Sequence, residues 1–225
     1  RALKMHGGVD KKELGTENLE ALAKGIKNLE KHIENIAKYN LPSVVAINAF
    51  PTDSEAELQL LKDTCNKMGV DVAISKVWEK GADGGIELAE KLLEILDTKE
   101  ANYQPLYDLN LSIKEKIETI AKEIYGADGV AFDKKVLTKM KKYEAQGLAD
   151  LPICVAKTQY SLSDQPTLLG RPSGFTIKIN DLIPSAGAGF LVAISGSIMR
   201  MPGLPKRPAA VNMDIDKDGK IVGLF

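Results

Sequence analysis

The order of helix and strand signals in the first hundred residues constrains the fold of this chain more than any other feature. Segments with the three- and four-residue apolar spacing of helices alternate with short, strongly apolar segments typical of strands. The expected elements are a helix, a strand, a helix, a strand and a helix, at residues 16–39, 43–47, 52–68, 70–78 and 81–96. Strands that alternate with helices predict parallel pairing through right-handed crossovers, so we expect an α/β fold with a parallel βαβ layer.

Local signals predict where these elements begin and end. Thr52 and Glu55 form a T-x-x-E capping box, which predicts the start of the second helix, and Gly69 predicts its end. The strand at 43–47 lacks the alternation of a sheet with one wet face, so we expect both of its faces to be buried.

The second half of the chain has a different character. A polar linker at about residues 97–108 precedes two helices, one opened by a capping box at Ser112–Glu115 and ended by Gly126, the other at 133–146. Short strand candidates then alternate with loops rich in proline, glycine and serine, at residues 153–158, 174–179, 189–194 and 220–225. This pattern predicts a helical linker followed by a smaller β-rich α+β region.

The change near residue 100 predicts two domains, an α/β domain at 1–100 and a second domain at 101–225. The chain opens on RALKMHGG without an initiator methionine, inside what could be a strand. We therefore expect the C-terminal portion of a longer chain, in which Arg1–Met5 pair with upstream strands. Without those strands, an apolar face of the first domain would be exposed.

Composition narrows the function classes. The 225 residues are enough to bury a sizeable core. The formal net charge is −1 and basic residues do not cluster, which argues against electrostatic binding to nucleic acid or to a membrane surface. Cys65 and Cys154 lie far apart without a CxxC motif, and His6 and His32 lack metal-ligand spacing, so we expect no disulfide framework or zinc site. A reducing cytosol fits best, and no apolar run approaches the ~20 residues of a membrane-spanning helix.

Three motifs imitate known binding loops but fail at a defining position. Residues 214–220, DIDKDGK, begin like a calcium loop, yet position twelve is Phe225 instead of a glutamate, so a hairpin turn is preferred. Residues 185–190 (SAGAGF) and 201–208 (MPGLPKRP) are rich in glycine or proline. The chain contains no G-x-x-x-x-G-K-[ST] and no complete G-x-G-x-x-G, so tight turns are favoured over phosphate contacts for both loops.

The loop at 156–175 has two interpretations of equal weight. Lys157 and Arg171 flank the hydroxyl groups of Ser161 and Ser163. These cations would hold an anionic ligand or a carboxylate tail. The alternative is a capped turn with a surface ion pair.

Two aromatic residues occupy positions where α/β proteins bind ligands. Phe50, in VVAINAFPTDSEAE, and the only tryptophan, Trp78, each follow the carboxyl end of a predicted strand in one βαβ unit. Neighbouring parallel strands lie about 4.8 Å apart, and two strands separated by a third lie about 10 Å apart. A slot that stacks a flat ring on both faces needs walls roughly 7 Å apart. The two loops could form such a slot, although spacing alone favours packing of each aromatic on the following helix.

Six stretches of the chain, in order and spanning nearly all of it, resemble one family: formate–tetrahydrofolate ligase, also called formyltetrahydrofolate synthetase. They are RALKMHGG, LPSVVAINAFPTDSEAEL, VWEKGADGGIELA, CVAKTQYSLSDQPTLLGRPSGF, SAGAGFLVAISGSIMRMPGLPKRPAA and MDIDKDGKIVGLF. The terminal GLF also resembles the natural C-terminus of the family.

The resemblance implies an ATP-dependent, cytoplasmic, homotetrameric ligase of one-carbon metabolism. Formate is phosphorylated to formyl phosphate, and N10 of tetrahydrofolate attacks it to give 10-formyltetrahydrofolate, ADP and phosphate. ATP with Mg²⁺ is the implied cofactor, with a monovalent cation as a further candidate. In the family a phenylalanine and a tryptophan sandwich the folate ring system, and they match Phe50 and Trp78, which reverses the preference for simple packing.

One departure from the family bears on activity. Its Walker-A-type loop, with the lysine, and the basic residues that hold formyl phosphate lie upstream of RALKMHGG. We therefore expect this chain to supply part of the folate pocket, to contain no catalytic residue or metal ligand, and to be inactive alone. A non-catalytic folate or pterin binder, or an oligomerisation module, is the alternative.

Overall fold

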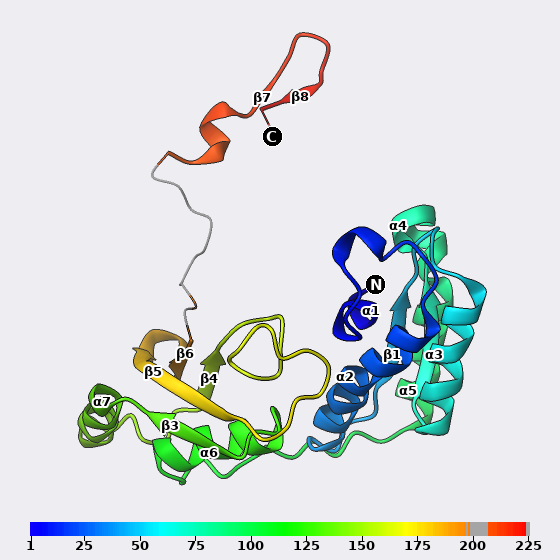
Figure 1. Ribbon diagram of the computed structural model, residues 1–225. Coiled ribbons are helices and arrows are strands. Elements are labelled where there is room, and N and C mark those ends of the chain that lie inside the picture. Colours follow the sequence, from blue (N-terminus) through cyan, green and yellow to red (C-terminus); the bar gives the residue numbers. More distant parts are fainter. Residues whose placement is uncertain (197, 199–206, 224–225) are drawn as a thin grey trace.

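The computed structural model describes residues 1–196, 198 and 207–223. Figure 1 shows an α/β region and a β-rich region side by side, with the long helix α2 (Leu19–Ala37) between them. A short C-terminal hairpin of β7 (Asp214–Ile215) and β8 (Ile221–Val222) lies away from both. The fold is thus of the mixed α/β type that the sequence predicted.

The α/β region follows the predicted order of helices and strands. Its elements are α1 (Ala2–His6), the 3-10 turn η1 (Lys11–Glu13), α2, β1 (Val44–Asn48), α3 (Glu55–Lys67), β2 (Asp71–Ser75), α4 (Val77–Lys80), η2 (Gly81–Gly85) and α5 (Ile86–Thr98). Strands β1 and β2 pair in parallel, from Val44 opposite Asp71 to Asn48 opposite Ser75. Gly69 ends α3 with a φ of 70°, a left-handed conformation that glycine adopts without strain.

Two expectations for this region are wrong in detail. The capping box of α3 is formed by Ser54 and Glu57 instead of Thr52 and Glu55. The helix starts two residues later because the Asp53 carboxylate accepts from the Phe50 N–H and closes a turn there. Strand β1 is not buried on both faces either: it has β2 as its only strand neighbour within the described residues, and two of its five residues are exposed.

The first residues form a helix instead of the expected strand. Helix α1 packs on α2 so closely that a Cβ on Gly25 would lie 1.7 Å from the Leu3 carbonyl oxygen. Lys4, 1% exposed, fixes this contact, because its Nζ lies 2.9 Å from Glu57 Oε1 and donates to the Thr16 carbonyl at 3.1 Å. The helical conformation is therefore stabilised by a buried ion pair and a glycine contact that no local sequence pattern reveals.

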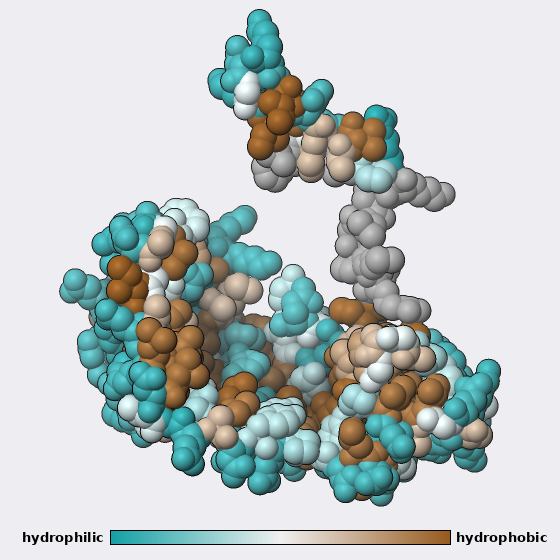
Figure 2. Space-filling model, turned by 180° about the vertical axis from the view of Figure 1, so that it is seen from behind, coloured by the Kyte–Doolittle hydropathy of each residue, from teal (hydrophilic) through white to brown (hydrophobic). Residues whose placement is uncertain are grey.

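An exposed apolar face on the α/β region is present, but α4 and α5 carry it. Its members are Val77, Trp78, Ile86, Leu92, Leu93 and Leu96. Figure 2 shows hydrophobic residues gathered over this region of the molecule. A patch of this kind on a helix face favours association with another surface.

The β-rich region combines two helices with a mixed sheet. Its elements are α6 (Ile113–Glu123), β3 (Gly129–Phe132), α7 (Lys134–Ala145), β4 (Ile153–Ala156), β5 (Thr176–Ser185), the 3-10 turn η3 (Ala186–Ala188) and β6 (Phe190–Ser195). The sheet order is β3-β5-β6-β4, with β5 and β6 antiparallel and the two outer pairs parallel. Strand β3 was not predicted, since it starts only three positions after the helix stop at Gly126.

The core of this region lies between the sheet and its two helices. Fully buried aliphatic side chains from α6, α7, β5 and β6 form one cluster, which includes Ile113, Ile117, Val136, Ile177, Ile179, Leu182 and Leu191. Each such side chain contributes roughly 1.5–3 kcal/mol through burial. The capping box at Ser112 and Glu115 starts α6 as predicted.

A polar face of α2 joins the two regions, and we call this junction the seam. Asn28 donates to the Gly170 carbonyl at 2.9 Å, Lys31 to the Glu123 carbonyl at 2.7 Å and Asn35 to the Ile124 carbonyl at 2.9 Å. Lys31 and Asn35 thereby satisfy carbonyls at the C-terminus of α6, which have no partner within that helix. All three side chains are buried, so the seam is a specific hydrogen-bonded contact.

Candidate functional site

Phe50 lies at the carboxyl end of β1, as the parallel pairing requires. The Ala49 N–H still donates to the Ser75 carbonyl at 3.0 Å, so the pairing with β2 extends one residue past the strand. The chain then turns: the Phe50 N–H donates to Asp53 Oδ2 and the Asp53 N–H to the Phe50 carbonyl, both at 2.9 Å. This turn holds the aromatic residue at the sheet edge.

Trp78 follows the neighbouring strand in the four-residue helix α4. A glycine-rich turn closes the segment, with the Lys76 N–H donating to the Gly84 carbonyl at 2.9 Å. A Cβ on Gly84 would lie 2.3 Å from the Lys76 carbonyl oxygen, so the closure requires glycine. The Trp78 side chain is 69% exposed and therefore free to change its rotamer.

The structure brings these two rings together. Their centroids lie 6.1 Å apart with an interplanar angle of 45°. A ring stacked between two parallel walls needs roughly 7 Å, so the space between them is closed in this conformation. A modest rotation of the exposed Trp78 side chain would open it.

A cavity adjoins Phe50 on the side of α1. It encloses about 290 Å³ between α1, α2, β1 and α3, and Trp78 does not line it. The Arg1 guanidinium lies 4.2 Å from the centroid of the Phe50 ring and donates to Thr52 Oγ1 at 2.8 Å. The phenylalanine is thus held by a cation–π contact as well as by its turn. Arg1 and Asp53 were not predicted as site residues, and the polar run Thr52–Ser54 after Pro51 is the local signal that could have indicated the turn at Asp53.

Comparison with known protein families identifies the chain. A family model described as formate–tetrahydrofolate ligase matches residues 1–225. The chain belongs to this family. Family membership implies a ligase reaction on formate and tetrahydrofolate, and it agrees with the resemblance of the six sequence stretches.

Of the two interpretations of the 156–175 loop, the structure favours the capped turn with a surface ion pair over an anionic ligand shared by Lys157 and Arg171. Arg171 makes a bidentate ion pair with Glu34 of α2, at 2.7 and 2.6 Å. Lys157 donates to the carbonyls of Thr158, Ser161 and Ser163 within its own loop. Arg171 is therefore a seam residue, and the two cations do not share a ligand.

The loops that imitate binding motifs are turns where the structure describes them. SAGAGF forms the connection between antiparallel β5 and β6, with Gly189 at φ 76°. In DIDKDGK the Asp216 carboxylate accepts from the N–H groups of Asp218 and Lys220, both at 2.9 Å, within the β7–β8 hairpin. MPGLPKRP falls almost entirely outside the described residues.

The SAGAGF loop does not have the geometry of a phosphate-binding cradle. SAGAGF precedes a strand, so its backbone N–H groups do not converge at a helix N-terminus as a phosphate cradle requires. In the part of the chain that the structure describes, no three side chains of the metal-ligating types come together.

Over the same residues, no helix combines the length and apolar character needed to cross a membrane.

Proposed function

We propose that this chain provides the pterin-stacking part of the folate site in a formate–tetrahydrofolate ligase. The observation that carries the proposal is the pairing of Phe50 and Trp78 at the carboxyl edge of a parallel βαβ unit, with ring centroids 6.1 Å apart. Ligands of open α/β sheets bind at this edge, and stacking on a flat conjugated ring contributes on the order of 1 kcal/mol per aromatic wall beyond burial.

Binding then involves two local changes. Trp78 rotates outward, which its exposure permits, and the pterin ring enters between it and Phe50. Phe50 stays in place because Asp53 holds its backbone N–H and Arg1 covers its ring. The preorganised wall therefore loses little conformational entropy on binding, and most of the cost falls on Trp78.

Tryptophan fluorescence tests this proposal directly, because Trp78 is the only tryptophan. Titration with tetrahydrofolate is expected to quench it, and Phe50→Ala should weaken affinity about tenfold or more, which corresponds to about 1.4 kcal/mol. Phe50→Leu should lose nearly as much, since it keeps apolar bulk without a ring. Tyr103→Ala, which removes an exposed aromatic in the linker, is the control and should bind as the wild type does. Equal affinity for Phe50→Ala and the control would disprove the stacking role.

The same proposal extends to the limits of the chain's activity. We infer that phosphorylation of formate, in a cytoplasmic, tetrameric enzyme using ATP with Mg²⁺, requires a phosphate-binding loop and positioned cations, and these 225 residues contain no G-x-x-x-x-G-K-[ST] loop. The 225-residue chain alone should therefore produce no 10-formyltetrahydrofolate from formate, ATP and tetrahydrofolate. Turnover above a control without protein would contradict this inference.

A second candidate function is assembly. The exposed apolar face of α4 and α5 favours a role in oligomerisation, with or without folate binding. The fluorescence titration distinguishes the two functions, because the Trp78 fluorescence of a module that serves assembly alone would not change on addition of tetrahydrofolate.

A further inference from the structure

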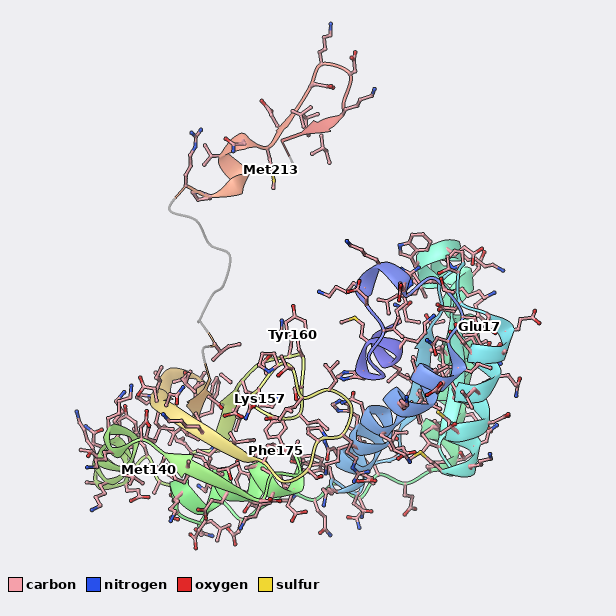
Figure 3. The ribbon with its side chains drawn as sticks, in the orientation of Figure 1. Glu17, Met140, Lys157, Tyr160, Phe175 and Met213 are labelled. Atoms are coloured by element: carbon pink, nitrogen blue, oxygen red, sulfur yellow. The ribbon has the colours of Figure 1, made fainter. Side chains whose placement is uncertain are left out.

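The seam encloses a polar cavity that neither Phe50 nor Trp78 lines. It has a volume of about 230 Å³, and its lining includes His6, Asn28, His32, Tyr125, Lys157 and Ser161. These residues come from α1 and α2 on one side and from the end of α6 and the loop after β4 on the other. We call this cavity the seam pocket. Figure 3 shows Lys157 at the base of that loop and Tyr160 near its outer turn.

Lys157 places a positive charge at the pocket without an ion-pair partner among the described residues. Its ammonium group donates to three carbonyl oxygens and lies 4.8 Å from the centroid of the Tyr125 ring. Burial lowers the pKa of Lys157 to about 8, and the only carboxylate that opposes this shift is Asp164. Carbonyl dipoles and a ring face solvate a cation but leave its charge uncompensated, so the pocket carries a positive potential.

The two histidines add hydrogen-bond donors to the same cavity. His6 Nδ1 accepts from the Gly170 N–H at 3.1 Å, which leaves Nε2 as the protonated nitrogen of the neutral ring. Burial lowers the pKa of both imidazoles. The neighbouring His32 lowers the pKa of His6 further, and the charges of Lys157 and Lys31 lower the pKa of His32 further. Each of these neighbouring groups carries or can acquire positive charge, and none is a carboxylate.

The nearby carboxylates are engaged elsewhere. Glu34 is paired with Arg171, and Glu123 with Lys38. Asp164 accepts from the Lys178 N–H at 3.0 Å and from the Ser163 hydroxyl at 3.2 Å. An anion in the pocket would therefore meet Lys157, His6 and His32 without displacing an internal counter-ion.

From this arrangement we propose that the seam pocket binds a small oxyanion, a carboxylate or a phosphate group, between Lys157, His6 and His32. The imidazole N–H groups of His6 and His32 would donate to the oxyanion. Lys157, whose three N–H groups already bind carbonyls, would act through its charge, for which the oxyanion supplies the missing counter-charge. Of two possible sources, the glutamate end of tetrahydrofolate rests on the proposed function. Helix α1 connects the two sites, because Arg1 at its start contacts the Phe50 ring and His6 at its end lines the seam pocket, and its five residues span about 7.5 Å along the axis. A free or ligand-borne phosphate group is the other source.

The two histidines make the test specific, because the chain contains no others. Their Hε1 resonances are followed by ¹H–¹³C NMR while sodium phosphate, tetrahydrofolate or tetrahydropteroate, which lacks the glutamate, is added at constant ionic strength. Saturable shifts of both resonances with tetrahydrofolate but not tetrahydropteroate assign the glutamate carboxylates. Saturable shifts with phosphate alone assign a phosphate group. No saturable shift with any of the three would overturn the proposal.

Variants connect the response to the pocket. Lys157→Met should weaken oxyanion binding about fivefold or more, whereas Lys141→Met, which removes an exposed charge from α7, should leave it unchanged. Lys157→Met removes three hydrogen bonds from its loop and for that reason can fail to fold. In that case His32→Gln is used as the test variant, because the His32 side chain makes no hydrogen bond among the described residues. Wild-type affinity in His32→Gln or in folded Lys157→Met would refute the proposal. Quenching of Trp78 by tetrahydropteroate is scored separately, so failure of the folate site and of the seam pocket are distinguishable.

Discussion

Replacing Gly25 with alanine should detach α1 and so disturb both ends of that helix. An alanine Cβ at this position would lie 1.7 Å from the Leu3 carbonyl oxygen and 2.6 Å from the Leu3 carbonyl carbon. Contacts below 3.0 Å to backbone atoms are not tolerated, so α1 must move by at least 1.3 Å along the line to the oxygen. Helix α1 carries Arg1, Lys4 and His6, and all three would move with it.

The size of the effect follows from the contacts that this movement breaks. The clash pushes α1 away from α2, and a shift of that size is enough to disturb the 2.9 Å Lys4–Glu57 pair, whose charges lie at a buried site. Breaking one partner of a buried pair costs about 3–5 kcal/mol, and alanine returns about 1 kcal/mol as a better helix former than glycine. Solvation of Lys4 after detachment reduces the cost further, so we expect a net destabilisation of about 2–3 kcal/mol.

Urea unfolding and amide hydrogen exchange measure this effect. The unfolding midpoint of the α/β region should fall by about 1 M, and the amides of Met5, Gly7 and Val9, which bond within and just after α1, should lose protection. Gly187→Ala is the matched control, because its φ is not positive and a Cβ there meets nothing within 4 Å. If Gly25→Ala is as stable and as protected as this control, the close approach of α1 and α2 is not what determines the position of α1.

Two further predictions concern pH and association. Because the pKa of Lys157 is lowered to about 8 from its ordinary value of 10.5, the unfolded chain binds more protons between these pH values. The free energy of unfolding should therefore rise from about pH 8 to pH 10.5 and lose this contribution as pH falls through 8. Urea unfolding of the wild type and Lys157→Met across this window measures the difference, and parallel pH profiles would contradict it. On α5, Leu93 and Leu96 are 59% and 67% exposed, so Leu93→Glu and Leu96→Glu should reduce self-association and hydrophobic dye binding relative to Glu94→Gln. Sedimentation velocity tests this, and a wild-type chain that remains monomeric at high concentration and binds no dye would count against an associating face.

Much of the element order was predictable because the signals are local. The capping box at Ser112 and Glu115 involves residues three positions apart, and Gly69, Gly126 and Gly147 all adopt the positive φ that ends a helix. The same locality misplaced the start of α3, since two overlapping boxes occur in TDSEAE and the Asp53 turn selects the second. Strand β3 was missed because its pairing with β5 joins residues more than forty positions apart.

Some features of the candidate site were predictable from the sequence, and others depend on tertiary packing. That Phe50 and Trp78 share an edge follows from the sequence, because parallel strands in one βαβ unit end on the same side. The closed spacing of their rings and the Arg1 contact depend on rotamers and on the packing of α1, which the sequence does not reveal. The sequence left open whether Arg171 shares an anionic ligand with Lys157 or forms a surface ion pair, because its partner, Glu34, lies 137 residues away.

The sequence by itself therefore determined the alternation of helices and strands, their glycine stops and the edge on which the aromatics lie, since each depends on residues within a few positions or on chain direction. The tertiary structure alone decided that residues 2–6 form a helix, that Lys31 and Asn35 satisfy carbonyls of α6, and that Lys157 faces two histidines across the seam. Lys31 and Glu123 are 92 residues apart. A buried polar group must find a partner wherever the fold brings one, and that choice is made only when the two regions pack together.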